Sequence, residues 1–338
     1  MKKIKSETKL CLMCMEEHEV ETMEIEDQET YKGVEVSFNA IFEYCSNADE
    51  YLETEEMIKA NSLAMKDAYR KEVSLLTSNE IIGIRDKYKV SQKDFSDILD
   101  WGKATITRYE NHQVQDRVHD DVLRKIDSDP NWFLDMLERS KDTLSEKAYQ
   151  KYYLEANEQF KHKQNQYLID SIKSIYADFK DDLDTGGIEL NLNKVVEMIN
   201  YLAQKVESLH KVKLMKMLWF SDVLHFKRKG VAISGLVYSA LPMGAVPEGY
   251  EQIVLLDNVN YDVVYYGDNV AYKFRQTPGF KIKDLKADEI ATLDYIIEQF
   301  GNLNTDEIVE KMHEEEAYRC TNKNCIIPFS YAEKLMVD

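Results

Sequence analysis

The segment 91–110, with the sequence SQKDFSDILDWGKATITRYE, constrains the fold of this chain more than any other stretch. A serine opens a short helical pattern, a glycine interrupts it, and a second short helical pattern follows, which predicts two helices joined by a tight turn. In the second pattern Ile106 and Tyr109 stand three residues apart, so we expect both to face inward. Small, polar and basic side chains then face outward, as in a helix-turn-helix that presents one helix to the major groove of DNA.

Candidate DNA contacts lie on the second of these helices, expected at 103–108, and at the start of the first. Arg108 is placed to donate two hydrogen bonds to a guanine, and Thr105 to set its methyl group against a thymine. Gln92 is expected to contact backbone phosphate. The candidate DNA-binding residues are Gln92, Lys103, Ala104, Thr105, Thr107 and Arg108. The alternative is an ordinary helical hairpin with solvated charges.

The overall charge of the chain opposes DNA binding. Asp and Glu number 62 against 43 Lys and Arg, which gives a formal net charge of −19. Such a field repels phosphate, so DNA must bind to a local basic face, with modest and salt-sensitive affinity that we expect to require a homodimer. An acidic surface also suits a basic protein partner.

No stretch is long and apolar enough for a membrane span, and no apolar run follows the basic start, so we expect no secretory signal and no membrane partner. We therefore expect a cytoplasmic protein. In that reducing compartment its five cysteines are thiols or metal ligands before they are disulfides.

The spacing Cys11-Leu-Met-Cys14 is that of a knuckle, in which a tight turn brings two thiolates to one side of a zinc ion. A second such pair would complete the site, but after Cys45 the position of the fourth cysteine holds Ala48. Two interpretations stay open. Either the three thiolates hold a structural zinc with His18, Asp49 or water as fourth ligand, or the finger is degenerate, held by its small core or binding metal only weakly. A catalytic zinc is not expected, because no His/Glu pair accompanies the cysteines. The pair Cys320 and Cys325 is interpreted as two ordinary thiols in a loop.

These patterns predict a mostly α chain with small β parts. We expect a zinc-finger-like domain at 1–75, an all-α helix-turn-helix domain at 76–140, a helical linker at 141–189 and an α+β domain at 190–338. In the first part, 21–26 and 31–38 alternate like half-buried strands, 40–45 leads toward a helix, and a helix begins near Thr54.

The second part is expected to hold five helices. Thr77 or Ser78 caps the first, with Glu80 placed for a capping box, and Ser91 caps the next. In the last part, the apolar patterns predict helices at 195–203, 212–226, 286–300 and 304–314, and strands at 252–257 and 262–266.

The helix expected at 212–226 combines a broad apolar side with polar residues at helical spacing. Asp222 and His225 suggest an enzyme at first sight, but no nucleophile or third group lies nearby in sequence. A hydrogen-bonded structural pair is the better interpretation, and we expect no enzyme. The candidate partner-binding residues of this helix are Lys213, Lys216, Trp219, Asp222 and His225.

With these residues considered together, the chain resembles antitoxins of toxin–antitoxin systems. Its first 140 residues resemble the MqsA-type, or YgiT-type, antitoxins, in which a zinc-finger domain precedes an Xre-type helix-turn-helix. The matching residues are Cys11, Cys14, Cys45 and ITRYE at 106–110. The part from about Asn193 onward resembles the SocA-like, or Panacea, domain, on KLMKMLWFSD at 213–222, His225, YSALPMGAVP at 238–247 and 285–313.

The resemblance implies a non-enzymatic type II antitoxin that binds its operator DNA as a dimer and neutralises a cognate protein toxin encoded nearby. The family's DNA-reading arginine falls on Arg108, whereas its asparagine falls on Ala104, which cannot make a bidentate contact to adenine. A second hypothesis is a stand-alone helix-turn-helix transcriptional regulator with a C-terminal sensing or protein-interaction domain. An open reading frame for a small protein beside the gene favours the antitoxin, and a ligand that shifts DNA binding favours the regulator.

Overall fold

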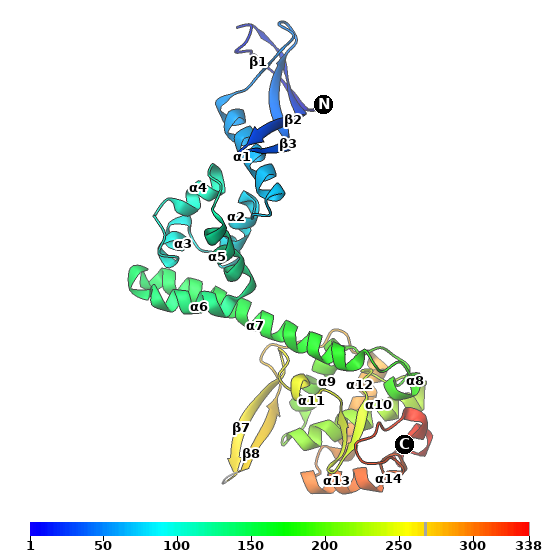
Figure 1. Cartoon of the computed structure of the whole chain (residues 1–338). Helices are drawn as coiled ribbons and strands as arrows, with labels where there is room; N and C mark the ends of the chain where they lie inside the picture. The colour runs from blue at the N-terminus through cyan, green and yellow to red at the C-terminus, as the bar shows by residue number, and fades with distance from the viewer. Residues whose placement is uncertain (267–268, 338) are drawn as a thin grey trace. The chain divides into compact units, whose positions relative to one another are not determined.

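The chain folds as two units, Met1–Lys163 and Gln164–Asp338. The computed structural model describes residues 1–266 and 269–337. About half of the described residues are helical, and the sheets are small and antiparallel (Figure 1). No helix within the described residues is long and apolar enough to cross a membrane.

The first unit opens with a four-stranded antiparallel sheet in the order β1-β2-β3-β4, formed by β1 (Lys2–Leu10), β2 (Glu17–Tyr31), β3 (Val34–Cys45) and β4 (Glu50–Leu52). Alternation along β3 puts its apolar side chains on one face, which α1 (Glu55–Glu72) covers (Figure 1). Thr54 caps α1 by accepting a hydrogen bond from the Met57 amide, at 3.3 Å. The helix start expected near Thr54 is therefore confirmed.

One expectation for this region was wrong, and one strand was missed. The stretch 40–45 does not lead toward a helix but continues β3 to Cys45. No strand was expected before residue 21, yet β1 pairs with the first half of β2. The side chains of β1 are almost all exposed, so the strand is held by backbone pairing and not by an apolar pattern.

Residues 76–140 hold five helices, as expected: α2 (Ser78–Lys87), α3 (Gln92–Ile98), α4 (Thr105–Asn111), α5 (Arg117–Ser128) and α6 (Pro130–Arg139). The expected caps are confirmed. Thr77 and Glu80 form a capping box at the start of α2, and Ser91 accepts from the Asp94 amide at the start of α3. One apolar core joins the five helices, with Ile81, Phe95, Ile106, Leu123 and Phe133 fully or almost fully buried.

A short 3₁₀ turn, η1 (Lys141–Thr143), leads into α7 (Glu146–Tyr176), a helix of 31 residues. The boundary between the two units falls inside α7. Its early residues Tyr149 and Tyr152 belong to the core of the first unit, and its late residues Ile172 and Tyr176 to that of the second. A single turn, α8 (Asp182–Thr185), ends at Gly186, whose positive φ of 69° suits glycine.

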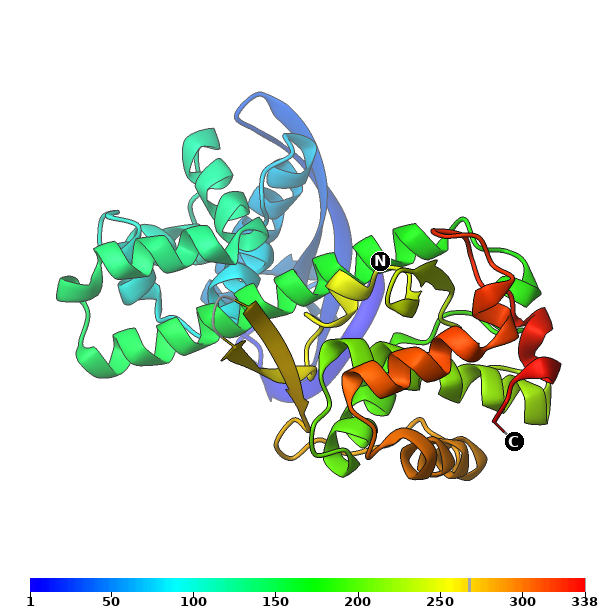
Figure 2. The ribbon, with the colours of Figure 1, turned by 90° about the horizontal axis from the view of Figure 1, so that it is seen from below.

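The second unit is built around α10 (Lys211–Lys229). Packed against it are α9 (Leu192–Lys205), α12 (Ala287–Phe300), α13 (Thr305–Glu314), η2 (Phe329–Lys334), β6 (Gly244–Pro247) and β8 (Asn269–Arg275). β5 (Tyr238–Leu241) pairs with β6, and β7 (Asn260–Tyr266) with β8. The β7–β8 hairpin extends away from the helices of this unit in both views (Figures 1 and 2).

The helices expected at 195–203, 212–226, 286–300 and 304–314 and the strand at 262–266 are confirmed. The strand expected at 252–257 is wrong, because this apolar run contains the end of a helical turn, α11 (Tyr250–Ile253), and no strand. One further helical turn, α14 (Glu316–Arg319), precedes the C-terminal segment.

Candidate metal site and nucleic-acid interface

Three cysteines and one histidine converge at one end of the N-terminal sheet. Cys11 and Cys14 lie in the turn between β1 and β2, His18 on β2, and Cys45 at the end of β3. Their ligand atoms all lie within 4.8 Å of one another. The turn is closed by two backbone bonds, from the Cys11 amide to the Glu16 carbonyl at 2.9 Å and from the Met15 amide to the Cys11 carbonyl at 2.8 Å.

The orientation of His18 suits a metal ligand. Its Nδ1 lies 2.9 Å from the Glu19 carbonyl oxygen, which can only accept, so Nδ1 carries the proton. Nε2 is then left with its lone pair, and it lies 3.6 Å from Sγ of Cys45. A ring N–H bonded to a backbone carbonyl is the usual support of a metal-binding histidine.

The thiols of the cluster have shifted acidities. Hydrogen bonding from the backbone of Cys14, and more weakly of Met13, lowers the pKa of the Cys11 thiol to about 6. Burial raises the pKa of the Cys45 thiol. A thiolate at Cys11 is the form that binds zinc.

The donor set of three sulfurs and one imidazole nitrogen fits a closed tetrahedral zinc site of the structural kind. Of the fourth ligands considered from the sequence, the structure brings His18 into the cluster. Asp49 instead accepts a hydrogen bond from the Tyr44 hydroxyl at 2.5 Å. The cluster is therefore compatible with structural zinc despite Ala48. Cys320 and Cys325 are both exposed, free thiols.

α3 and α4 form the pair expected from the opening segment, and a partly buried ion pair joins α4 to α2. Glu110 on α4 accepts from the Arg85 guanidinium on α2 at 2.7 Å. The Gln92 side chain at the start of α3 donates to Glu110 at 2.5 Å and accepts from the Thr107 hydroxyl at 3.0 Å. Both the NH₂ group and the oxygen of the Gln92 amide are thus hydrogen-bonded to side chains of α4. The sequence had suggested that Gln92 contacts backbone phosphate.

One face of α4 is open to solvent. Ile106 and Tyr109 are buried, as expected. On the opposite side Ala104 and Arg108 are exposed and Thr107 is partly exposed. The exposed Asn111, three residues beyond Arg108, continues this face, although the sequence reasoning missed it. Its position seven residues after Ala104 was the signal that would have found it.

Lys103 is exposed just before α4, as expected for a DNA contact. The expected position of Thr105 was wrong. It was expected on the outer side, but it is buried, and its Oγ1 lies 3.3 Å from the Arg108 guanidinium, which donates to it. The helix begins at Thr105 and not at Lys103, which turns this residue toward the interior. Thr105 therefore supports Arg108 and does not itself face the solvent.

The five candidate partner-binding residues of α10 were also expected to face outward, but every residue from 213 to 225 is buried. The sequence pattern suggested a polar ridge, but other elements cover α10 on all sides. The Lys213 ammonium donates to the carbonyls of Gly301 and Leu303, at 2.7 and 2.6 Å, and the Lys216 ammonium to that of Ala245, at 3.0 Å. Burial lowers the pKa of Lys216 to about 7.

Asp222 and His225 were expected to form a pair, but they bond to different partners. Oδ1 of Asp222 accepts from the amides of Ile233 and Ser234, both at 2.9 Å. Its Oδ2 accepts from the hydroxyls of Ser234 and Tyr238, at 2.5 and 2.6 Å. Burial raises the pKa of Asp222, and these hydrogen bonds oppose the rise.

The imidazole of His225 instead contacts the Thr292 hydroxyl on α12, at 3.1 Å. Trp219 is 1 % exposed and packs edge-on against Phe220. All five side chains of this helix therefore hold the second unit together from inside.

Within the second unit, residues 214–318 match the model of the family described as "Antitoxin SocA-like, Panacea domain". The matched segment begins on α10 and ends on α14, so it includes the β5–β6 and β7–β8 hairpins and the buried residues of α10 discussed above except Lys213. No curated protein and no solved structure matches the chain. The match supports the C-terminal part of the resemblance drawn from the sequence, and it suggests an antitoxin-type role with a toxin as partner.

Proposed function

We propose that the protein is the antitoxin of a type II toxin–antitoxin system. Its C-terminal domain binds and neutralises a cognate toxin encoded nearby, and α4 represses the shared operon by binding operator DNA. The observation that carries the proposal is the match of residues 214–318 to the SocA-like Panacea antitoxin domain. The resemblance of the first 140 residues to MqsA-type antitoxins remains a prediction that points the same way.

The exposed face of α4 supports the DNA-binding arm. Arg108 and Asn111 are side chains that read base edges in a major groove, and Lys103 adds a positive charge beside them. A face this short reads only a few base pairs, so we expect a homodimer with two half-sites. The Cys11, Cys14, His18 and Cys45 cluster would hold a structural zinc that fixes the turn between β1 and β2.

This role needs no catalysis, so the protein is proposed to be non-enzymatic. Because operator DNA is its second partner, the same role places it in the cytoplasm.

The partner contact needs a surface other than α10, because the α10 side chains are buried. One face of the β7–β8 hairpin offers apolar side chains inside the matched segment. Tyr265 and Val270 lie opposite each other in the pairing and are 71 % and 55 % exposed. Val263 and Tyr272 form the next pair on this face, closer to the core. We assign the toxin contact to this apolar hairpin face.

A growth-rescue experiment tests the neutralising arm. The product of the neighbouring gene is expressed from one plasmid, and the full chain or a variant from another. We expect the full chain to restore growth and Tyr265→Asp to lose most of the rescue, because a buried carboxylate in an apolar contact is costly. Asn260→Asp is the matched control, since it changes the charge equally on the opposite face of the hairpin.

Two outcomes of this experiment contradict parts of the proposal. A neighbouring product that is not toxic, or a chain that does not restore growth, contradicts the antitoxin function. It would favour the stand-alone regulator, whose DNA binding should then respond to a ligand. Full rescue by Tyr265→Asp, at equal protein level, contradicts only the assignment of the hairpin face.

A further inference from the structure

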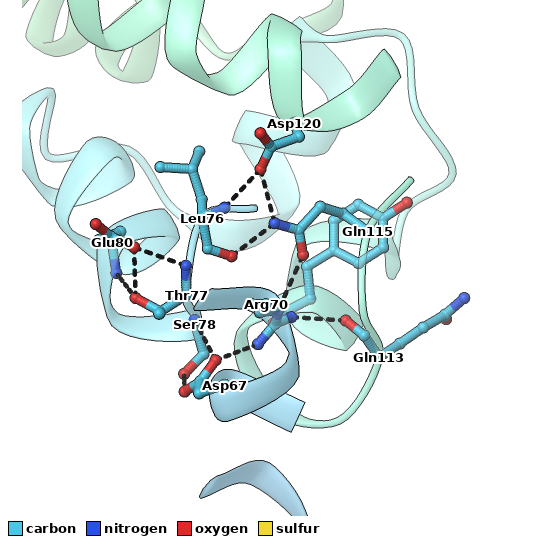
Figure 3. Close-up of polar contacts among 10 residues, drawn as sticks. Asp67, Arg70, Leu76, Thr77, Ser78, Glu80, Gln113, Gln115 and Asp120 are labelled. Atoms are coloured by element: carbon cyan, nitrogen blue, oxygen red, sulfur yellow. Dashed lines mark hydrogen bonds and ion pairs between the residues drawn. The ribbon is translucent and has the colours of Figure 1, made fainter. Parts of the chain in front are cut away.

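Three arginine side chains join the C-terminal end of α1 to the connection between α4 and α5. We call Arg70, Arg117 and Arg124 the arginine clamp. Arg70 belongs to α1 and its side chain is 0 % exposed. Its guanidinium donates to the Gln113 carbonyl at 2.8 Å and to the Gln115 side chain at 3.0 Å (Figure 3). It also donates to the Tyr109 carbonyl at 2.7 Å.

The other two arginines act in the reverse direction, from α5 to α1. Arg117 donates to the carbonyls of Val73 at 3.0 Å and Ser74 at 3.2 Å, and Arg124 donates to that of Ser74 at 3.1 Å. The last carbonyls of a helix lack partners within it, and they form the negative end of its dipole. Guanidinium groups from each side of the junction therefore contact carbonyls at or just after the C-terminal end of the helix on the other side.

Buried side chains complete the junction. Gln115 donates to the Leu76 carbonyl at 2.6 Å and to Asp120 at 2.9 Å. Asp120 also accepts from the Leu76 amide at 2.7 Å (Figure 3). Its other oxygen accepts from the Arg124 guanidinium, also at 2.7 Å. On the other side of Arg70, Asp67 accepts from its guanidinium at 2.6 Å and from the Ser78 amide at 2.8 Å. The junction thus leaves few ways for α1 and α4 to shift separately.

We propose that Arg70 is a positioning residue for DNA recognition by α4. Tyr109, whose carbonyl it holds, directly follows Arg108 in the chain, so loss of the guanidinium frees the end of the helix that carries Arg108 and Asn111. The proposal rests on the DNA-binding function proposed above. It also extends the DNA-binding unit beyond 76–140, since α1 and the turn after it become part of its support.

Full-length variants test the role of Arg70. Arg70→Met removes the guanidinium, Arg70→Lys keeps the charge but not the forked donors, and Lys71→Met is the matched control on the next, exposed position of α1. Affinities for operator and for unrelated duplex are measured at a temperature where circular dichroism shows each variant folded. Hydrogen exchange of the amides at 108–116 is measured without DNA.

We expect Arg70→Met to weaken operator binding about tenfold, which corresponds to about 1.4 kcal/mol. Binding to unrelated duplex should change less than about twofold, because phosphate contacts do not depend on the register of Arg108. Arg70→Lys should fall between the wild type and Arg70→Met, and Lys71→Met should match the wild type. The amides at 108–116 should exchange faster than in the wild type in Arg70→Met and Arg70→Lys, but not in Lys71→Met.

If Arg70→Met does not fold, Arg117→Ala takes its place, because Arg117 is exposed and its loss opens the clamp from the other side. The same changes are expected, to a smaller degree. Unchanged operator affinity and unchanged exchange at 108–116 in the folded variant would overturn the positioning role. Failure of the DNA-binding function looks different: the wild type itself would not prefer operator over unrelated duplex, while the exchange experiment would still report on the clamp.

Discussion

The stability of the second unit should depend strongly on the buried carboxylate of Asp222. Asp222 is 0 % exposed and accepts four hydrogen bonds, from two backbone amides and two hydroxyls. Asp222→Ala removes all four acceptor contacts, and a buried donor left unsatisfied costs about 1–3 kcal/mol. The Ser234 hydroxyl can turn to another acceptor, but the two amides and the Tyr238 hydroxyl cannot move without distorting the chain. We therefore expect a loss of at least about 3 kcal/mol, a large part of the roughly 5–15 kcal/mol of a typical domain.

Asp222→Asn separates hydrogen bonding from charge. Its amide oxygen can still accept from the amides of Ile233 and Ser234, while its NH₂ group now faces the two hydroxyls. Half of the acceptor contacts remain, and the desolvation cost of a buried charge disappears. We expect a loss of about 2 kcal/mol or less, smaller than for Asp222→Ala.

The assay is urea unfolding of the full chain followed by tryptophan fluorescence. Trp219 is the one tryptophan of residues 164–338, so Trp101→Phe and Trp132→Phe in the background make the signal specific to the second unit. The change in midpoint, at unchanged slope, gives the loss of stability. A loss below about 1 kcal/mol for Asp222→Ala would show that the four donors do not depend on this carboxylate. A larger loss for Asp222→Asn than for Asp222→Ala would refute the same reasoning.

Three other predictions concern the first unit. Arg108→Ala should weaken operator binding by about 1–3 kcal/mol in a gel-shift titration, and an unchanged affinity would remove Arg108 from the base contacts. Protein purified with zinc present should contain about one zinc per chain by metal analysis. Cys45→Ser should lower this zinc content, whereas the control Cys320→Ser should not. A wild type without zinc would show that the finger is metal-free. Hydrogen bonds from the backbone and side chain of Thr77 lower the pKa of Glu80. A carboxyl with a lowered folded pKa stabilises the fold above its unfolded pKa of about 4.3 and loses this contribution as the pH falls through the folded value. The urea midpoint of the first unit should therefore fall between about pH 5 and pH 3, with a shallower decline in Glu80→Gln, and equal declines would contradict the assignment.

Local signals made much of the fold predictable from the sequence. The caps at Thr54, Thr77 and Ser91 depend on residues only three positions apart, so they can be predicted from the local sequence. The inward position of Ile106 and Tyr109 follows from helical spacing in the same way. These features need no knowledge of distant segments.

Features that depend on distant segments were missed. β1 is a strand because β2 pairs with it, and its own exposed Lys, Glu and Thr residues carry no strand pattern. The short apolar run at 252–257 fits a strand or a helical turn equally well, and its neighbours decide for α11. His18 was one of three possible fourth ligands, and its pairing with Lys9 next to the knuckle places it at the cysteines.

The polar residues of α10 illustrate the limit for the candidate site. Helical spacing put Lys213, Lys216 and Asp222 on a ridge, and a polar ridge on a helix usually faces water. Here Lys213 and Lys216 donate to backbone carbonyls of segments that lie 88 and 29 residues away, and Asp222 accepts from amides of the segment that follows α10. Only the packing of these segments around α10 shows that the residues are internal supports.

Co-purification of the full chain with the product of the neighbouring gene tests the central claim most directly. We predict one complex on gel filtration that contains both chains, because residues 214–318 match the SocA-like Panacea model and the proposed function makes the second unit the toxin-binding part. The complex should persist with Arg108→Ala, because that change concerns DNA alone. The antitoxin function would be contradicted if the purified chain and the purified neighbouring product eluted separately at micromolar concentration, both for the wild type and for Arg108→Ala.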